Sequence, residues 1–162
     1  MNPVEDLFAH FEPSPLTASW PLSECHSRLN LGRHFEWDDA IEFSPSCDQQ
    51  ALASQGIGIW DCDLKDNALT WSDGVYDLFG LPRGVLVHRE TAVSLYEEGS
   101  RSAMERLRAY SIKHRRGFTL DVEIEPANAS RRWIRLVAAP ICVSSRPVRL
   151  RGLKWDVTPQ YS

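Results

Sequence analysis

The alternation of apolar and polar residues predicts three consecutive strands in the last third of the chain. The stretch FTLDVEIE, residues 118–125, places apolar side chains on one face and polar ones on the other, which is typical of a half-buried antiparallel strand. The turns PANAS and SSRP separate it from two further strands over residues 131–143 and 148–157. Pro140 has no backbone donor, and it therefore predicts a sheet edge or a bulge within residues 131–143.

A hairpin and two helices are predicted in the middle of the chain. IGIWDCDL and ALTW, residues 57–64 and 68–71, are rich in β-branched and aromatic residues and flank the turn KDN. A helix is expected over residues 73–80 after the capping residue Ser72. A longer helix, with apolar residues three or four apart, is expected to open at Ser100.

The order of these elements predicts the fold class. Short helices are also expected after Ser46 and over residues 89–98. The chain then reads as two strands, a helical block and three strands. Strand groups that flank a helical block indicate one antiparallel sheet with helices on one face, which is an α+β fold.

Residues 1–46 are predicted to form an extension of short helices and loops, and residues 47–159 the main domain. Prolines recur along the extension and forbid long helices, yet it carries too many large apolar side chains for a solvated linker. We expect its short helices to dock on the protein's own sheet or on a second copy of the chain.

Charge is distributed unevenly along the chain. Residues 1–50 hold nine Asp and Glu against two Lys and Arg, a net charge of −7, whereas residues 51–162 hold thirteen against sixteen, a net charge of +3. The acidic leader either is solvated or lies on the body of the protein or on the basic face of a partner. A body at +3 is too weakly basic to predict nucleic-acid binding.

Composition indicates a soluble, cytoplasmic protein with a packed core. Hydrophobic residues make up 43% of the chain, which is enough to exclude full disorder. No apolar run reaches the roughly 18 residues of a membrane span, and the N-terminus lacks the basic-then-apolar order of a signal peptide. The four cysteines are scattered, so we expect reduced thiols and no metal site.

Three segments, in this order, resemble the PAC-containing PAS domains of the PAS fold-3-like subgroup. They are GIGIWDCDLKDNALTWSDGVYDLFGLP, GFTLDVEIEPANASRRWIRLVAAPI and PVRLRGLKWDVT. The resemblance covers residues 50–159 and implies a five-stranded antiparallel sheet with helices over one face and a small cavity between them. The His-Pro-Glu-Asp motif of the subgroup is absent: the corresponding stretch is YEEGSR, residues 96–101, so no role of that histidine carries over.

The resemblance implies a non-enzymatic signalling module. In related sensors a linker to an output domain follows the Asp-x-Thr signature, here Asp156 to Thr158, whereas this chain stops at Ser162. We therefore expect a stand-alone, single-domain bacterial regulator. It would act by protein–protein contact on a sensor histidine kinase or another PAS-containing protein, and we expect it to form a homodimer.

The expected interface lies on the outer face of the sheet. Along the final strand one row of side chains consists of Arg149, Arg151, Leu153 and Trp155, and aromatic and arginine side chains are typical of interface hot spots. The opposite row holds Val148, Leu150, Gly152, Lys154 and Asp156. The sequence leaves open which row faces outward.

Two alternatives remain open. The chain can be a small-molecule-binding PAS sensor, including the input module of a larger kinase or cyclase. Its candidate cavity lining consists of Tyr76, Phe79, Leu95, Leu120, Val122, Ile134 and Leu136. The other alternative is an enzyme of another α+β fold that uses Asp61 and Asp63 as a carboxylate pair, which would require a deep pocket around them.

No cofactor is predicted, although an unidentified small ligand fits the resemblance. Flavin photochemistry needs a reactive cysteine in an Asn-Cys-Arg-Phe-Leu-Gln-like helix, whereas Cys62 and Cys142 lie in predicted strands. Haem needs an axial histidine that faces the cavity. His88 lies in a loop and His114 at a basic helix end, so we expect surface or capping roles for both.

Overall fold

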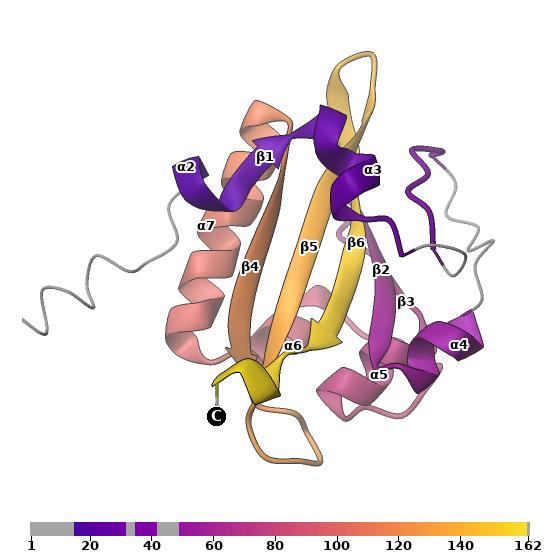
Figure 1. The fold of residues 1–162 in the computed structure, drawn as a ribbon, viewed down its shortest axis with the longest axis vertical. Coiled ribbons are helices and arrows are strands. Elements are labelled where there is room, and N and C mark those ends of the chain that lie inside the picture. The colour runs from indigo at the N-terminus through magenta and orange to yellow at the C-terminus, as the bar shows by residue number, and fades with distance from the viewer. Residues whose placement is uncertain (1–14, 32–34, 42–48, 162) are drawn as a thin grey trace, which may run out of the picture.

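A computed structural model describes residues 15–31, 35–41 and 49–161 as a curved antiparallel sheet covered on both faces (Figure 1). The sheet has six strands in the order β1-β4-β5-β6-β2-β3, and each strand is antiparallel to its neighbours. The strands are β1 Ser19–Pro21, β2 Ile57–Asp63, β3 Leu69–Trp71, β4 Arg116–Ile124, β5 Arg132–Val143 and β6 Arg146–Asp156. The predicted α+β fold and its five strands are confirmed, and the N-terminal extension supplies a sixth.

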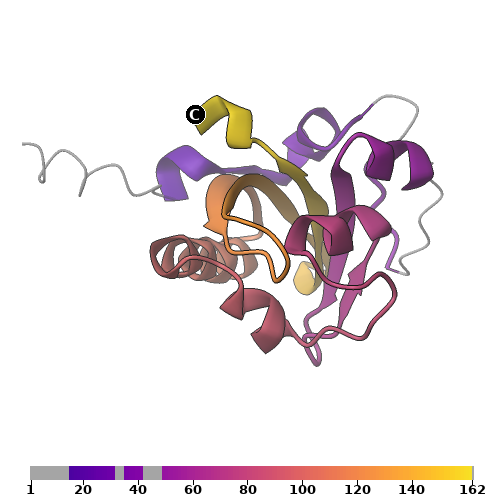
Figure 2. The same cartoon turned by 90° about the horizontal axis from the view of Figure 1, so that it is seen from below.

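Three helices cover the inner, concave face of this sheet. They are α5 Asp73–Phe79, α6 Arg89–Ser94 and α7 Glu98–His114. Seen from below, they lie on the opposite side of the sheet from the N-terminal segment (Figure 2). The remaining helices are α2 Pro15–Ala18, α3 Cys25–Arg28, α4 Gln49–Ser54 and two 3-10 turns, η1 Leu22–Glu24 and η2 Thr158–Tyr161. The domain boundary predicted at residue 46 lies outside the described residues, as does Ser46.

Two helix starts differ from the predicted caps. Ser72 precedes α5, but its hydroxyl makes no capping bond and instead accepts a hydrogen bond from the Ile59 N–H at 2.8 Å. Helix α7 begins before Ser100, because the Glu97 carboxylate accepts from the N–H groups of Gly99 and Ser100, both at 2.9 Å. These bonds hold the pKa of Glu97 below its usual value. The residue before α5 is thus bonded to the sheet, and α7 is capped by Glu97. Neither helix is capped by the predicted serine.

Of the two possibilities predicted for Pro140, an edge or a bulge, the edge is excluded because β5 is a central strand between β4 and β6. An irregularity in register does occur one residue later, between Ile141 and Cys142. Pro140 pairs with Leu150 of β6 just before that shift, so the proline lies where regular pairing is about to be interrupted.

Each face of the sheet carries its own apolar core. The inner core lies under α5 and α7 and includes Phe79, Leu107, Phe118, Val122, Ile124 and Ile134. The outer core joins the sheet residues Ile59, Val137, Ala139, Ile141 and Leu153 to Trp20, Cys25, Leu29, Phe35, Trp37 and Leu52. Central strands are therefore buried on both faces, which explains why LVAAPI in β5 is continuously apolar while FTLDVEIE in β4 alternates.

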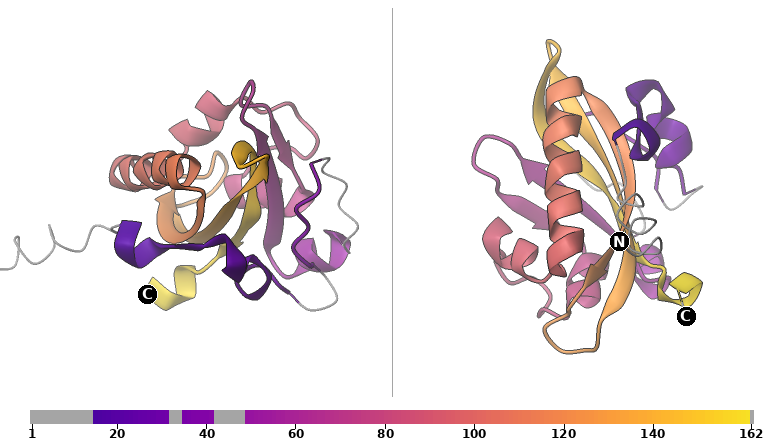
Figure 3. Two further views of the ribbon diagram at one scale, coloured as in Figure 1. Left: turned by 90° about the horizontal axis from the view of Figure 1, so that it is seen from above. Right: turned by 90° about the vertical axis from the view of Figure 1, so that its left-hand side faces the viewer.

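The outer core is closed by what we call the N-terminal cover, residues 19–31 and 35–41. Figure 3 shows it on the side of the sheet opposite α7. Trp20 in β1 lies against Gly117, where an added Cβ would be 2.2 Å from the indole ring, and its Nε1 donates to Thr119 Oγ1 at 3.1 Å. The prediction that the extension docks on the protein's own sheet is confirmed for these residues.

Gly152 provides a sharp test of this packing. A Cβ at this position of β6 would lie 1.7 Å from the carbonyl oxygen of Val137 in the neighbouring strand, and backbone cannot yield to it cheaply. Gly152→Ala should therefore lower the free energy of unfolding by about 1–3 kcal/mol, as measured by urea denaturation. Gly99→Ala is the control, since its nearest neighbour is the flexible Glu97 carboxylate at 3.3 Å. Equal midpoints for Gly152→Ala and wild type would contradict this description of the β5–β6 pair.

Candidate functional site

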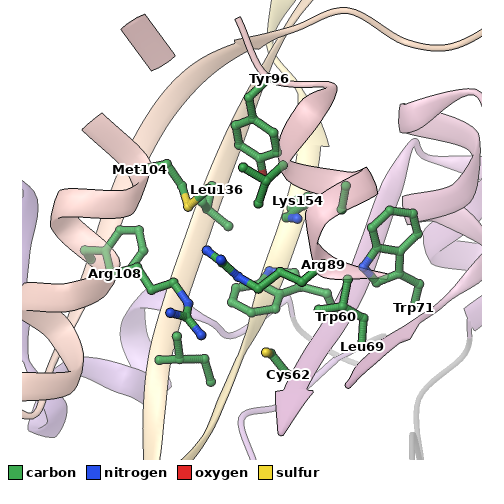
Figure 4. A pocket seen from close by; sticks show the side chains of 14 residues that line it. Trp60, Cys62, Leu69, Trp71, Arg89, Tyr96, Met104, Arg108, Leu136 and Lys154 are labelled. Atoms are coloured by element: carbon green, nitrogen blue, oxygen red, sulfur yellow. The ribbon is translucent and has the colours of Figure 1, made fainter. Parts of the chain in front are cut away.

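A small cavity lies between the inner face of the sheet and helices α6 and α7 (Figure 4). Its volume is about 60 Å³, whereas a single water needs about 10–15 Å³ on this kind of scale. Most of the lining is apolar and includes Trp60, Leu69, Trp71, Tyr96, Met104, Phe118, Leu136 and Leu150. Four further side chains bring polar atoms: Cys62, Arg89, Arg108 and Lys154. A mostly apolar pocket with a few convergent polar groups is the usual form of a small-molecule site.

Lys154 is the feature that sets this cavity apart from ordinary core. It lies on β6 opposite Leu136, points to the inner face and is only 6% exposed. Its Nζ lies 4.9–5.8 Å from the centroids of four aromatic rings, those of Phe79, Trp60, Trp71 and Tyr96. Cation–π attraction offsets part of the loss of hydration.

The four aromatic rings compensate only part of the hydration free energy that the Lys154 ammonium group loses on burial. Within the described part of the chain, neither a hydrogen-bond acceptor nor a carboxylate pairs with Lys154. Burial consequently lowers the pKa of its amine to about 7. A buried cationic side chain without a counter-ion lowers the stability of the folded protein. A role in packing alone therefore does not explain a lysine at this inward-facing strand position.

Two arginines extend the positive charge to the helical side of the cavity. Arg89 of α6 forms an ion pair with Glu105 of α7, and Arg108 of α7 donates to Asn67 Oδ1 at 2.9 Å in the turn between β2 and β3. Figure 4 shows both guanidinium groups lying toward the same space as the Lys154 amine and the Cys62 sulfur. Three basic side chains from three elements therefore converge on one small volume.

The other polar groups near Lys154 are uncharged near neutral pH. Burial raises the pKa of the Cys62 thiol and of the Tyr96 phenol above their ordinary values. The indole Nε1 of Trp60, a residue that lines the cavity, is buried and has no acceptor among the described residues. The site thus holds donors and positive charge in excess of acceptors.

The predicted cavity residues are only partly in place. Leu136 lines the cavity, and the Phe79 ring contacts the Lys154 amine. Leu120, Val122 and Ile134 are buried in the inner core beside it, and Leu95 is half-buried against that core. Tyr76 points elsewhere, since its hydroxyl donates to the Val85 carbonyl at 2.7 Å. The sequence-based prediction selected apolar and aromatic side chains for the lining and missed the basic residues Arg89, Arg108 and Lys154.

The row predicted as an interface does face the outer side of the sheet, but it is not open. Leu153 is fully buried in the outer core and Trp155 packs against it. Arg151 is 3% exposed, and its Nη1 donates to the carbonyls of Asp38 and Ala40 at 2.8 and 3.0 Å. The expectation that this row is exposed to a partner is therefore corrected: the N-terminal cover occupies it.

Asp61 joins this outer-face arrangement rather than a catalytic pocket. Its carboxylate is fully buried and accepts from Arg149 Nε at 2.9 Å and from Arg151 Nε at 2.8 Å. Asp63 accepts from Arg149 Nη1 at 3.1 Å. Since both Asp61 oxygens are bound by guanidinium groups, this carboxylate is not available as a general base.

The histidines considered for haem do not face the cavity. His88 is exposed at the start of α6 and makes no capping bond with its side chain. His114 is exposed at the end of α7 and its ring lies tilted by 37° against that of Tyr110, with ring centroids 4.2 Å apart. Neither residue is among the described residues that line the space around Lys154.

Comparison with known proteins identifies the fold. No protein-family model and no curated protein matches the chain. A sensory box histidine kinase/response regulator from Burkholderia thailandensis is similar over 70% of this chain and 86% of its own, with 21% identity and a TM-score of 0.60. The N-terminal domain of a diguanylate cyclase with PAS/PAC sensor from Marinobacter aquaeolei matches 65% of this chain and 99% of its own, with 16% identity and a TM-score of 0.59.

A PAS domain from Colwellia psychrerythraea is similar over 68% of this chain and 93% of its own, with 17% identity and a TM-score of 0.56. None of the described helices is both long and apolar enough to cross a membrane. The antiparallel sheet, the helices on its inner face and the cavity between them agree with these comparisons, and the chain has the PAS fold.

Proposed function

We propose that this protein is a non-catalytic, ligand-binding signalling module that holds a small molecule in the cavity around Lys154. The observation that carries the proposal is the buried, uncompensated amine of Lys154 in a space larger than a water molecule. Perturbed titratable groups in a pocket are typical of functional sites. Similar domains come from a histidine kinase/response regulator and a diguanylate cyclase, which supports a signalling role.

A structural route connects the cavity to the outer face. Alternate residues of β6 point to opposite faces, so Lys154 contacts the cavity while its neighbour Leu153 packs under the N-terminal cover. Arg151, two residues further, holds the carbonyls of the cover. A ligand that shifts β6 would therefore change the packing of the cover, and the cover is the element that a partner would sense.

The partner we propose is a signalling protein such as a sensor histidine kinase or another PAS-containing protein. Contact between PAS sheets, including a homodimer, would use the outer face, which carries apolar residues and the Asp61–arginine cluster. Because the cover occupies that face, such a partner has to displace the cover or bind to it. This second candidate, a pure protein–protein regulator, is favoured over ligand sensing if the protein from cells carries no ligand in the cavity.

Native mass spectrometry of protein purified from cells tests the ligand directly. We expect a retained small molecule that is lost when the protein is denatured. A mass equal to that of the bare chain, in preparations that have not been dialysed, would count against ligand sensing and leave the protein–protein regulator as the better description.

Cys25 provides a probe of cover docking. It is 4% exposed within the outer core, and burial raises the pKa of its thiol to about 11. Site-resolved alkylation should therefore modify Cys25 far more slowly than the half-buried Cys142. Trp20→Ala removes the ring that packs on Gly117 and should speed Cys25 labelling by at least about tenfold, while labelling of Cys62 stays unchanged.

The same assay classifies partners. A protein that binds by displacing the cover raises the rate at Cys25, and one that binds on top of the cover lowers it. If Trp20→Ala labels Cys25 at the wild-type rate, the cover does not protect this thiol, and the proposed link between the cover and the outer face is wrong.

A further inference from the structure

We propose that the ligand of the Lys154 cavity is a small organic anion, a monocarboxylate with an apolar body. The inference rests on the proposed ligand-sensing function and adds the chemical class of the ligand. It follows from the charges, the hydrogen-bonding groups and the lining of the cavity, which point to one class of molecule.

The charges around the cavity do not balance. Lys154, Arg89 and Arg108 bring positive groups to it, and of the described carboxylates only Glu105 pairs with one of them, Arg89. The remaining titratable neighbours, Cys62 and Tyr96, are neutral because burial raises the pKa of each. A cationic ligand would be repelled here, and a neutral one would leave Lys154 uncompensated. An anion supplies the missing counter-charge at short range from the buried Lys154 amine, where charge pairing is most effective.

The hydrogen-bonding groups of the cavity also favour an anion, because donors outnumber acceptors. The ammonium of Lys154 and the guanidinium of Arg108 are donors only, and neither has a carboxylate partner within the described ranges. A carboxylate offers two oxygens with about four acceptor sites, so a single group can serve both side chains.

The lining of the cavity determines the polarity and size of the ligand's body. Aromatic and aliphatic side chains such as Trp60, Met104 and Leu136 surround the basic groups. A second charge on the ligand would have to be buried among these apolar groups at high cost, which disfavours diacids and phosphorylated metabolites. A cavity of about 60 Å³ also restricts the body to a few carbon atoms, since a cavity that holds one benzene ring measures about 150 Å³.

Matched acid and amide pairs test this inference on the full chain. The probes are sodium propionate with propionamide and sodium butyrate with butyramide, because each pair differs in charge but hardly in shape. Titration calorimetry near pH 6, where Lys154 is protonated, should show each acid binding at least about tenfold more tightly than its amide. Tryptophan fluorescence gives a second readout, since Trp60 and Trp71 line the cavity.

Two lysine variants test whether the preference for acids over amides arises in the cavity. Lys154→Met keeps an unbranched side chain without charge and should remove most of the difference in affinity between the acids and the amides, because Arg89 and Arg108 remain in the lining. Lys113→Met, which removes an exposed lysine on α7, should leave every affinity unchanged. Wild-type affinity for the acids should fall as the pH rises above about 7, because the free protein then loses the Lys154 proton.

Each other outcome overturns a distinct claim. Amides that bind as tightly as acids, or acids that bind Lys154→Met as tightly as wild type, would overturn the anion class while leaving a ligand cavity in place. If no probe binds, the anion proposal is also overturned, and the native mass spectrum of the cellular protein then decides separately whether the cavity holds a neutral ligand or none.

Discussion

Replacing Asp61 with asparagine should lower the free energy of unfolding by about 3–5 kcal/mol, which is the usual effect of removing one partner of a buried ion pair. Asp61 is fully buried and directly opposite Arg151 in the β2–β6 register, and Arg149 binds its other oxygen. Asparagine keeps the shape but leaves two guanidinium groups without this counter-charge. Arg151 also loses the anchor that aims its Nη1 at the carbonyls of the cover.

Urea denaturation measures this loss, and the neighbouring carboxylate provides the control. Asp63 binds the same Arg149 at 3.1 Å, but its side chain is 31% exposed, so Asp63→Asn should cost less than about 1 kcal/mol. We expect Asp61→Asn also to speed Cys25 alkylation and Asp63→Asn not to do so. Equal unfolding midpoints for the two variants would contradict the stabilising role of the buried cluster, and equal Cys25 labelling would show that the cluster does not hold the cover.

Lys154→Met should stabilise the protein near pH 7 by about 1–4 kcal/mol, since a well-packed apolar side chain replaces a buried charge. It should also change how stability depends on pH. In the folded protein the pKa of Lys154 is about 7, against an ordinary value of 10.5. Between these values the unfolded chain binds the extra proton, so wild-type stability rises with pH by up to about 1.4 kcal/mol per unit.

The difference between the two proteins isolates this contribution. Below pH 7 Lys154 is charged in both states and its full burial cost is present, and the cost disappears as the pH rises toward 10.5. Buried thiols such as Cys62 act in the opposite direction, because their pKa is raised in the folded state, but they contribute equally to both proteins. The advantage of Lys154→Met over wild type should therefore shrink steadily with pH. A constant difference would mean that the amine is already neutral or well solvated near pH 7.

The strands could be predicted because their alternation is imposed by burial on the inner face. FTLDVEIE and VRLRGLKWDV became β4 and β6 close to the expected limits. The turn and capping residues were less informative, since Ser72 and Ser100 hydroxyls accept hydrogen bonds from the sheet, at Ile59 and Glu123, instead of capping helices. Tertiary contacts therefore overrode the local pattern at both helix starts.

The cover and the cavity were harder to predict, although each left a trace in the sequence. LVAAPI in β5 does not alternate, and such a run indicates a strand buried on both faces; the expectation of an open outer face overlooked this. Lys154 shares a face with Val148, Leu150 and Gly152, so a lysine on the inward row was already visible. What no pattern could supply is that Arg89 and Arg108, from two separate helices, meet that lysine.

Because β1 docks on the edge of β4, the smallest unit that folds on its own includes the N-terminal cover. A fragment trimmed to residues 49–161 would keep strands β2 to β6 and shed the cover. Such a fragment would present Val137, Ile141 and Leu153 to water, together with three unpaired backbone positions beside Gly117. Self-association of the trimmed fragment would then be a product of the trimming, and the oligomeric state of the protein has to be read from the untrimmed chain.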